Sequence, residues 1–184
     1  MLGIVLAAGD GRRMGGRKAR LLVDGQPLVV HHVRRLLDAG CVEVIAAVRP
    51  DDVALTLHAV ASTAKDALGS LRVALARARL AHDLVVITPV DALPVRLKTL
   101  ATLVEHAARA RAAVPTYDGA GGHPVVVWRH ALDALDRHAS LRELLRALGT
   151  RCARVPVDDA DVTADLDTPA DVMTHTSKAP VFLQ

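Results

Sequence analysis

Aromatic residues are scarce in this sequence of 184 residues, which contains one Phe, one Trp and one Tyr. Proteins that bind single-stranded nucleic acid stack the bases on aromatic side chains, and this chain offers no such platform. The formal net charge is +3, and the cations alternate with acids along the expected helices. The small basic excess is typical of a protein that binds phosphorylated small molecules, so no nucleic-acid partner is expected.

Cysteine is scarce as well, because Cys41 and Cys152 stand alone without any C-x-x-C motif. A disulfide framework and a thiolate zinc site are therefore not expected. The nine histidines are scattered and show no H-x-x-x-H spacing. Histidine-based zinc chemistry is thus not indicated either.

Long apolar runs are missing. The opening run, Met1 to Leu6, is too short for a signal peptide and meets charge at Asp10. No stretch reaches the roughly eighteen apolar residues that a membrane-spanning helix needs. We therefore expect a cytoplasmic protein without a membrane partner.

Apolar residues make up 51% of the chain and are mostly Ala, Leu and Val. Short continuous apolar runs predict buried strands at 2–8, 42–48 and 84–88, with further strands at 58–63, 112–116, 124–128 and 154–157. Helical patterns lie between them, at 26–39, 70–80, 96–111 and after the capping box at Ser140. This alternation predicts a single-domain α/β fold with a doubly wound, mostly parallel, Rossmann-like sheet over residues 1–176. Residues 177–184 are expected to form a loose tail.

The stretch after the first strand combines glycines with cations. Four glycines and five cations alternate there, namely Gly9, Gly11, Arg12, Arg13, Gly15, Gly16, Arg17, Lys18 and Arg20. Glycine lets the backbone approach a ligand closely, and successive N–H groups form an anion-binding nest. The loop predicts a polyphosphate site, with a solvated basic turn as the alternative.

Two common phosphate loops do not fit this stretch. A Walker A loop needs Lys followed by a hydroxyl directly after its second glycine, whereas Arg17 comes before Lys18 here. A dinucleotide loop opens a helix directly, whereas the next helical pattern begins only near Pro27. An NADP-dependent oxidoreductase that uses Arg49 for the 2′-phosphate is therefore disfavoured.

The segments LAAGDGRRMGGRK (Leu6 to Lys18) and DGQPL (Asp24 to Leu28) resemble the molybdenum cofactor nucleotidyltransferase family. The resemblance implies transfer of a nucleoside monophosphate from a nucleoside triphosphate to a phosphorylated acceptor. Molybdopterin is the favoured acceptor, with a sugar phosphate or another phosphorylated metabolite as the alternative. It also implies a molybdoenzyme or its maturation factor as a protein partner.

The resemblance assigns a set of nucleotide-binding residues: Leu6, Ala7, Ala8, Gly9, Gly11, Arg13, Lys18 and Ser70. Arg13 and Lys18 would be catalytic, because they would neutralise charge on the α-phosphate and the leaving pyrophosphate. Ser70 is equally explained as a helix N-cap. Ala8 stands where guanylyl-transferring relatives tend to have glycine, which favours CTP over GTP.

Two aspartates are the expected Mg²⁺ ligands. Asp91 follows the 84–88 strand, and in isolation it would be a turn residue before Pro94. The segment Asp165 to Asp171 matches the family pattern D-x-D-T-P-x-D, and helix capping explains Thr168, Pro169 and Asp171. The resemblance implies that Asp91 and Asp167 bind Mg²⁺, with Asp165 as the weaker choice. The family usually has Asp-x-Pro after this strand, whereas here two residues separate Asp91 from Pro94.

The motif Gly122-His123-Pro124 resembles the family's acceptor-binding sequence. A lone histidine before a strand is more often structural, so Gly122 and His123 are assigned to the acceptor by resemblance only. A catalytically silent nucleotide-binding protein is the other alternative that these motifs leave open.

Overall fold

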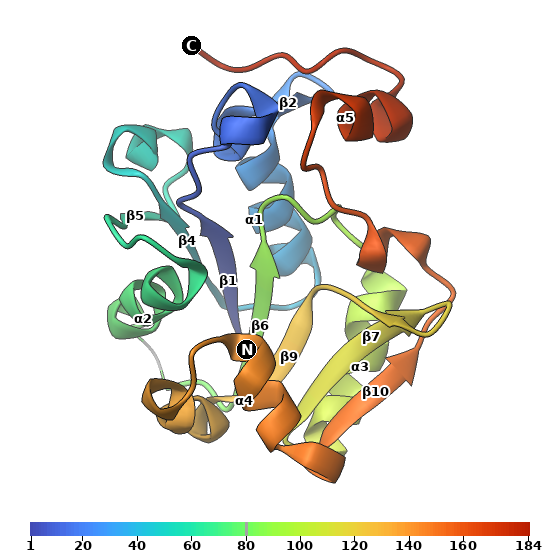
Figure 1. Cartoon of the computed structure of the whole chain (residues 1–184). Coiled ribbons are helices and arrows are strands. Elements are labelled where there is room, and N and C mark those ends of the chain that lie inside the picture. Colours follow the sequence, from blue (N-terminus) through green and yellow to red (C-terminus); the bar gives the residue numbers. More distant parts are fainter. Residues whose placement is uncertain (80) are drawn as a thin grey trace.

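The computed structural model describes residues 1–79 and 81–184 as one sheet with helices on both sides (Figure 1). The strands are β1 (Leu2–Ala7), β4 (Glu43–Val48), β5 (Ala59–Ala61), β6 (Leu84–Pro89), β7 (Ala112–Tyr117), β8 (Ala120–Gly121), β9 (Val125–Trp128) and β10 (Cys152–Pro156), and a separate hairpin joins β2 (Leu22–Val23) to β3 (Gln26–Pro27). The α-helices are α1 (Leu28–Asp38), α2 (Ala67–Arg77), α3 (Leu97–Arg109), α4 (Leu141–Ala147) and α5 (Pro169–Thr176).

Short 3₁₀ helices complete the described chain: η1 (Arg12–Met14), η2 (Lys18–Arg20), η3 (Pro50–Leu55), η4 (Arg129–Arg137), η5 (Gly149–Arg151) and η6 (Ala160–Thr163). In the part of the chain that the structure describes, no helix is long and apolar enough to cross a membrane.

The strands of the sheet follow the order β10-β7-β9-β6-β1-β4-β5, with β8 beside β7. Strand β9 runs antiparallel to both of its neighbours, and β8 is antiparallel to β7. The pairs of β1 with β4 and β6, of β4 with β5, and of β10 with β7 are parallel. The predicted mostly parallel α/β fold is confirmed.

The buried strands are apolar on both faces because helices cover both sides of the sheet. Val5 and Ala7 of β1 face the core that contains α1 and α3, whereas Leu2 and Ile4 face the core that contains α2, α4 and η4. Leu2 and Ile4 are fully buried. Each such side chain contributes about 1.5–3 kcal/mol relative to exposure. The burial of these central strands therefore fixes the positions of their carboxyl ends, from which the loops emerge.

Several predicted element boundaries were wrong by a few residues. Helix α1 begins at Leu28 instead of Gln26, because Gln26 and Pro27 pair with β2 in the hairpin. Helix α2 begins at Ala67, since Asp66 caps it by accepting a hydrogen bond from the Gly69 N–H at 2.7 Å. The alternative role of Ser70 as an N-cap is therefore wrong. The end expected for this helix, Leu80, lies outside the described residues.

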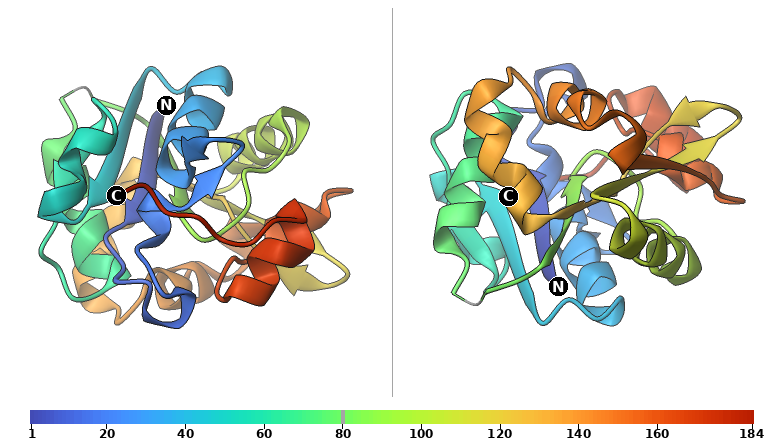
Figure 2. Two further views of the ribbon diagram at one scale, coloured as in Figure 1. Left: turned by 90° about the horizontal axis from the view of Figure 1, so that it is seen from above. Right: turned by 90° about the horizontal axis from the view of Figure 1, so that it is seen from below.

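Residues 177–184, expected to be a loose tail, are attached to the loop region. The N–H of Leu22 donates to the carbonyl oxygen of Val181 at 2.7 Å, and the N–H of Leu183 donates to that of Arg20 at 2.9 Å. Phe182 forms an antiparallel bridge with Leu21. Figures 1 and 2 show this C-terminal segment crossing the molecule beside the hairpin and the loop after β1. The expectation of a loose tail was wrong, because main-chain hydrogen bonds outside the sheet leave no clear sequence pattern.

Helix α5 offers a test of capping as opposed to ligand binding. Thr168 and Asp171 form a capping box, in which the Thr168 hydroxyl accepts from the Asp171 N–H and the Asp171 carboxylate accepts from the Thr168 N–H at 2.7 Å. We predict that Thr168→Ala lowers the free energy of unfolding by about 1 kcal/mol, measured by urea denaturation. Thr174→Ala, on the exposed side of the same helix, should change it by less than about 0.5 kcal/mol. Equal losses in the two variants would contradict the capping role.

Candidate active site

The loop after β1 folds back on itself at Gly11. This residue has a φ of +63°, and a Cβ there would lie 1.9 Å from the carbonyl oxygen of Gly16. Any side chain at position 11 would therefore force the two arms of the loop apart. Met14 and Ala19 point into the core and are 2% and 0% exposed. The buried anchors leave the intervening basic side chains at the surface of the loop.

A cavity of about 360 Å³ lies at the carboxyl ends of β1 and β6, beside this loop. Most of the residues predicted to bind the nucleotide line it: Leu6, Ala8, Gly9, Gly11, Arg13, Lys18 and Ser70. Ala7 does not, because its side chain lies in the core with 1% exposure. Ligands of open α/β sheets bind at this edge of the sheet. We call this space the nucleotide cavity.

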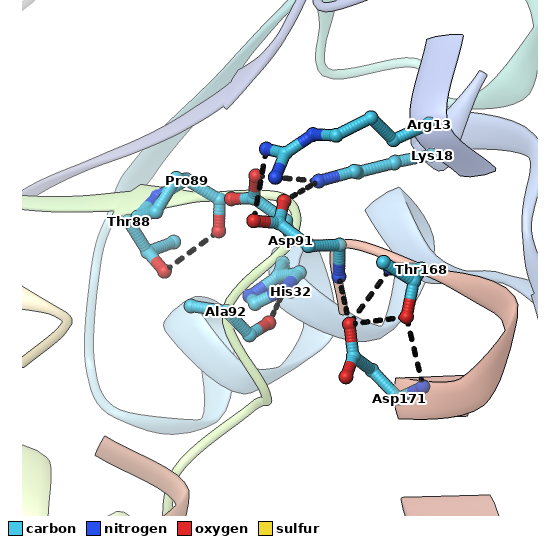
Figure 3. A network of polar contacts seen from close by, with 10 residues as sticks. Arg13, Lys18, His32, Thr88, Pro89, Asp91, Ala92, Thr168 and Asp171 are labelled. Carbon is cyan, nitrogen blue, oxygen red and sulfur yellow. Dashed lines mark hydrogen bonds and ion pairs between the residues drawn. The ribbon is translucent and has the colours of Figure 1, made fainter. Parts of the chain in front are cut away.

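Asp91 and Asp167, the two predicted metal ligands, both accept a hydrogen bond from the ammonium group of Lys18. Figure 3 shows Lys18 and Arg13 beside Asp91. The Lys18 Nζ lies 2.9 Å from Asp91 Oδ2 and 2.5 Å from Asp167 Oδ1. Arg13 donates to the other oxygen of Asp167 at 2.9 Å. The structure thus brings all four of these residues together at the edge of the nucleotide cavity.

A short main-chain pairing brings the two aspartates together although they are distant in sequence. The N–H of Leu166 donates to the carbonyl oxygen of Asp91 at 2.7 Å, and the N–H of Leu93 donates to that of Ala164 at 3.1 Å. Ala92 and Leu166 are 1% and 0% exposed and fix the pairing in the core. The longer turn between Asp91 and Pro94 therefore supplies the pairing partner for the segment that carries Asp167.

The charges in this cluster stabilise one another. Burial disfavours the Lys18 ammonium, but hydrogen bonds to Asp167 and Asp91 outweigh it and raise the pKa of Lys18. The hydrogen bond from Lys18, with a further contribution from Arg13, lowers the pKa of the Asp167 carboxyl. Lys18 and Asp167 are therefore both charged at neutral pH, and the carboxylates present a position that favours a cation.

The donor set in this cluster fits Mg²⁺. This ion usually takes one or two carboxylates and completes its shell with water and substrate phosphates. Asp91 and Asp167 supply two carboxylates, and the positive group of Lys18 already lies between them. Within residues 1–79 and 81–184, no three His, Cys, Asp or Glu side chains gather as an all-protein metal site. The arrangement therefore matches a magnesium site that substrate phosphates would complete.

Two of the five loop cations serve the loop instead of the cavity. Asp52 is fully buried and accepts from Arg20 Nε at 2.6 Å and from Arg17 at 3.3 Å. Asp51 accepts from Arg17 at 3.1 Å. These ion pairs fasten the segment on both sides of Lys18 to η3. Sequence reasoning missed this role, although the paired acids directly after a strand were a visible signal.

Arg49 and Ser70 also shape the nucleotide cavity. Arg49, which follows β4, pairs with Asp10 in the loop at 2.7 Å. Lining the same cavity, Ser70 is 3% exposed and its hydroxyl lies 3.2 Å from that of Ser62. Arg49 therefore ties the end of β4 to the loop, a role that the sequence did not reveal because its partner lies far away in the chain.

Gly122 and His123 lie outside the nucleotide cavity and line a second cavity of about 470 Å³. A Cβ at Gly122 would lie 1.8 Å from the carbonyl oxygen of Val162, so the close approach of these segments requires glycine. Burial lowers the pKa of His123, which keeps the ring neutral. The main-chain N–H of His123 donates to the Val162 carbonyl oxygen at 2.7 Å, and this hydrogen bond holds the motif beside η6.

Residues 3–155 match the MobA-like NTP transferase domain, and the chain belongs to that family. A curated relative, described as a probable molybdenum cofactor guanylyltransferase from Thermococcus sibiricus, is 42% identical over 48 residues. That match covers 26% of this chain and spans about a quarter of the relative, 25% of its length.

Solved structures share the fold over nearly the whole chain. The protein Rv0371c from Mycobacterium tuberculosis H37Rv has a TM-score of 0.82 at 23% identity, covering 96% of this chain and 97% of that one. Its complex with manganese has a TM-score of 0.76 at 24% identity, covering 97% and 98%. The 2-C-methyl-D-erythritol 4-phosphate cytidylyltransferase from Thermus thermophilus has a TM-score of 0.74 at 22% identity, covering 95% and 97%. At these identities the likeness shows the common fold.

His32 supports the turn that carries Asp91. This α1 residue is 2% exposed, and its Nε2 donates to the carbonyl oxygen of Ala92 at 2.9 Å (Figure 3). Burial lowers the pKa of His32 to about 4. In the unfolded chain the His32 imidazole would bind a proton below about pH 6.5, whereas in the folded chain it binds one only below about pH 4. The contribution of neutral His32 to the free energy of unfolding is therefore complete above pH 6.5 and is lost as the pH falls towards 4.

We predict that the parent loses roughly 3 kcal/mol of folding free energy through His32 over this range, measured by urea denaturation at several pH values. His32→Leu should be less stable at neutral pH, because the Ala92 carbonyl loses its donor, and it should show a flatter dependence between pH 6.5 and 4. His175→Gln removes an exposed histidine and should keep the parental slope. An unchanged slope in His32→Leu would contradict the assignment.

Proposed function

We propose that the protein transfers a nucleoside monophosphate from CTP, in preference to GTP, to a phosphorylated acceptor, with molybdopterin as the favoured acceptor and Mg²⁺ as the cofactor. The observation that carries the proposal is the cluster of Arg13, Lys18, Asp91 and Asp167 at the edge of the nucleotide cavity. A molybdoenzyme or its maturation factor would then receive the product. The partial match to a probable molybdenum cofactor guanylyltransferase supports the choice of acceptor.

Nucleotidyl transfer requires that the protein position the two substrates and neutralise the charge on their phosphates. An acceptor phosphate oxygen forms a bond to the α-phosphorus, the bond from that phosphorus to the bridging oxygen breaks, and pyrophosphate leaves. Arg13 and Lys18 neutralise the phosphate charge that builds up in this step. The backbone from Ala8 to Gly11 holds the base and phosphates. When bound between Asp91 and Asp167, Mg²⁺ would supply further charge neutralisation.

Lys18 has a double role in this scheme. With no phosphate in the cavity, its ammonium neutralises the two carboxylates at 2.9 and 2.5 Å. Asp91 and Asp167 would hold the metal ion, which would supply the positive charge that they need, and the Lys18 ammonium would then be free to bind phosphate oxygens. The exchange keeps every charge paired, so the site can admit a tetra-anionic substrate without exposing unpaired carboxylates.

The proposed base preference rests on Ala8, which lines the nucleotide cavity and is 7% exposed. Its methyl group narrows the loop where the base would lie, and a pyrimidine needs less room than a purine. We predict tighter binding of CTP than of GTP in calorimetric titrations with Mg²⁺, and a smaller preference in Ala8→Gly. Tighter binding of GTP by the parent would overturn the preference and leave the transferase proposal standing.

Pyrophosphate release tests the reaction itself. Each of the four nucleoside triphosphates is paired with molybdopterin and with a sugar phosphate. Release that requires molybdopterin supports the proposal, and release with a sugar phosphate alone would reassign the acceptor. A protein that binds nucleotide and releases no pyrophosphate with any of them would be a silent binding protein.

The two aspartates give the sharpest test of the mechanism. We predict that Asp91→Asn and Asp167→Asn each lower Mg²⁺-dependent turnover by about 10²-fold or more. The double variant should be little slower than the worse single variant, because groups that act as one unit are not additive. Pyrophosphate release under single-turnover conditions measures all three.

Asp165→Asn is the matched control, since it removes a carboxylate from the same segment two residues earlier. It should be far less harmful than Asp167→Asn. If Asp165→Asn instead abolishes turnover while Asp167→Asn does not, the second ligand is Asp165.

A further inference from the structure

The second cavity has an unusual charge pattern. Its walls combine the apolar side chains of Val114, Val125, Leu141 and Leu145 with three arginines, Arg142, Arg146 and Arg154, and with Cys152. Arg142 and Arg146 come from α4, and Arg154 comes from β10. Figure 1 shows α4 in front of the sheet, with β10 at its lower edge. We call this space the arginine cavity.

Among the described residues, the three arginines of this cavity lack acidic partners. No Asp or Glu of that part of the chain lines the cavity. Arg154 donates to a carbonyl oxygen, that of Gly119, at 3.3 Å. Glu143, between the two arginines of α4, is used to cap the helix and accepts from the Ala139 N–H at 2.7 Å. Like charges that share one cavity repel each other, so an anionic ligand would be stabilised there.

His123 adds a polar group to the same cavity. Its Nδ1 is buried and has no hydrogen-bond partner among the described residues. A buried polar atom without a partner is unfavourable by about 1–3 kcal/mol. His123 therefore carries an unsatisfied ring nitrogen in the wall of this cavity.

A small cavity shares lining residues with both the arginine cavity and the nucleotide cavity. This intermediate space has a volume of about 170 Å³. It shares Leu6, Asp66 and Ala67 with the nucleotide cavity and Leu141 with the arginine cavity. The small cavity thus borders both of the larger ones.

We propose that the arginine cavity binds a second anionic group of the acceptor, separated by an apolar body from the phosphate that is nucleotidylated. The apolar walls would hold the body, and Arg142, Arg146 and Arg154 would bind the distal anion. The inference rests on the proposed function for the identity of the ligand as acceptor. The enzyme would then select acceptors that carry an anionic group at each end.

Cys152 makes the anion site testable without any nucleotide. It lines the arginine cavity and is partly exposed, whereas Cys41 is buried. Iodoacetate and iodoacetamide alkylate a thiolate by the same displacement of iodide, and they differ in charge. Mass spectrometry of the intact parent protein gives the alkylation rate of Cys152 with each reagent. Because both reagents react with the same thiolate, the fraction of thiolate divides out of the ratio of the two rates. The ratio therefore measures the local preference for an anion.

We predict that Arg142→Gln with Arg146→Gln lowers the iodoacetate-to-iodoacetamide ratio by about tenfold, the lower end of what charge focusing in a cleft provides. Inorganic phosphate should slow iodoacetate in the parent and not in this variant. Arg109→Gln, an exposed arginine of α3, is the matched control and should keep the parental ratio. An unchanged ratio in the cavity variant would overturn the anion site.

Steady-state kinetics then separate the two proposals. With the acceptor identified by pyrophosphate release, the cavity variant should raise the acceptor KM about tenfold and leave the KM of the nucleoside triphosphate unchanged. A lowered alkylation ratio with an unchanged acceptor KM would overturn the assignment to the acceptor. Failure of pyrophosphate release with every acceptor would instead overturn the proposed function, while the alkylation ratio would still report on the anion site.

Discussion

The ion cluster of Lys18 with Asp91 and Asp167 is the interaction on which the rest of the site depends. It joins a loop near residue 18 to two segments that lie 73 and 149 positions further along the chain. All three side chains are at least partly shielded from water, which strengthens their attraction over that of a surface pair. The cluster ties the glycine-rich loop to the turn after β6 and to the segment before α5, which main-chain hydrogen bonds already pair with each other.

The remaining loop charges explain how so basic a segment can fold before any phosphate arrives. Arg17 forms an ion pair with Asp51, and Arg20 forms one with Asp52. Asp10 of the loop forms an ion pair with Arg49. Two of the five loop cations are thereby neutralised by acids outside the loop. Arg12, Arg13 and Lys18 are left lining the nucleotide cavity, so the loop has two cations that fasten it to η3 and three that face the cavity.

The sequence predicted the sheet and the nucleotide loop because both depend on local patterns. Continuous apolar runs such as Leu2 to Ala7 identify strands buried on both faces, and the alternation of glycines and cations identifies a basic loop. Long-range contacts left no such pattern: the burial of Asp52 under Arg17, and the pairing of Leu21 with Phe182, depend on which surfaces the fold brings together. The placement of Asp91 beside Asp167 was expected from a family resemblance, and the pairing of Leu166 with Asp91 supplies its physical basis.

The attachment of Phe182 to Leu21 has a consequence for the order in which the protein is made. On the ribosome the basic loop emerges early, whereas Asp167 and Phe182 follow about 150 and 160 residues later. Until then the loop has only one of the two carboxylates that pair with Lys18, Asp91, and lacks the segment that pairs with Leu21. Contacts of such sequence separation form late in folding, because chain closure must precede them. A nascent chain therefore carries the glycine-rich loop without its C-terminal contacts through most of its synthesis.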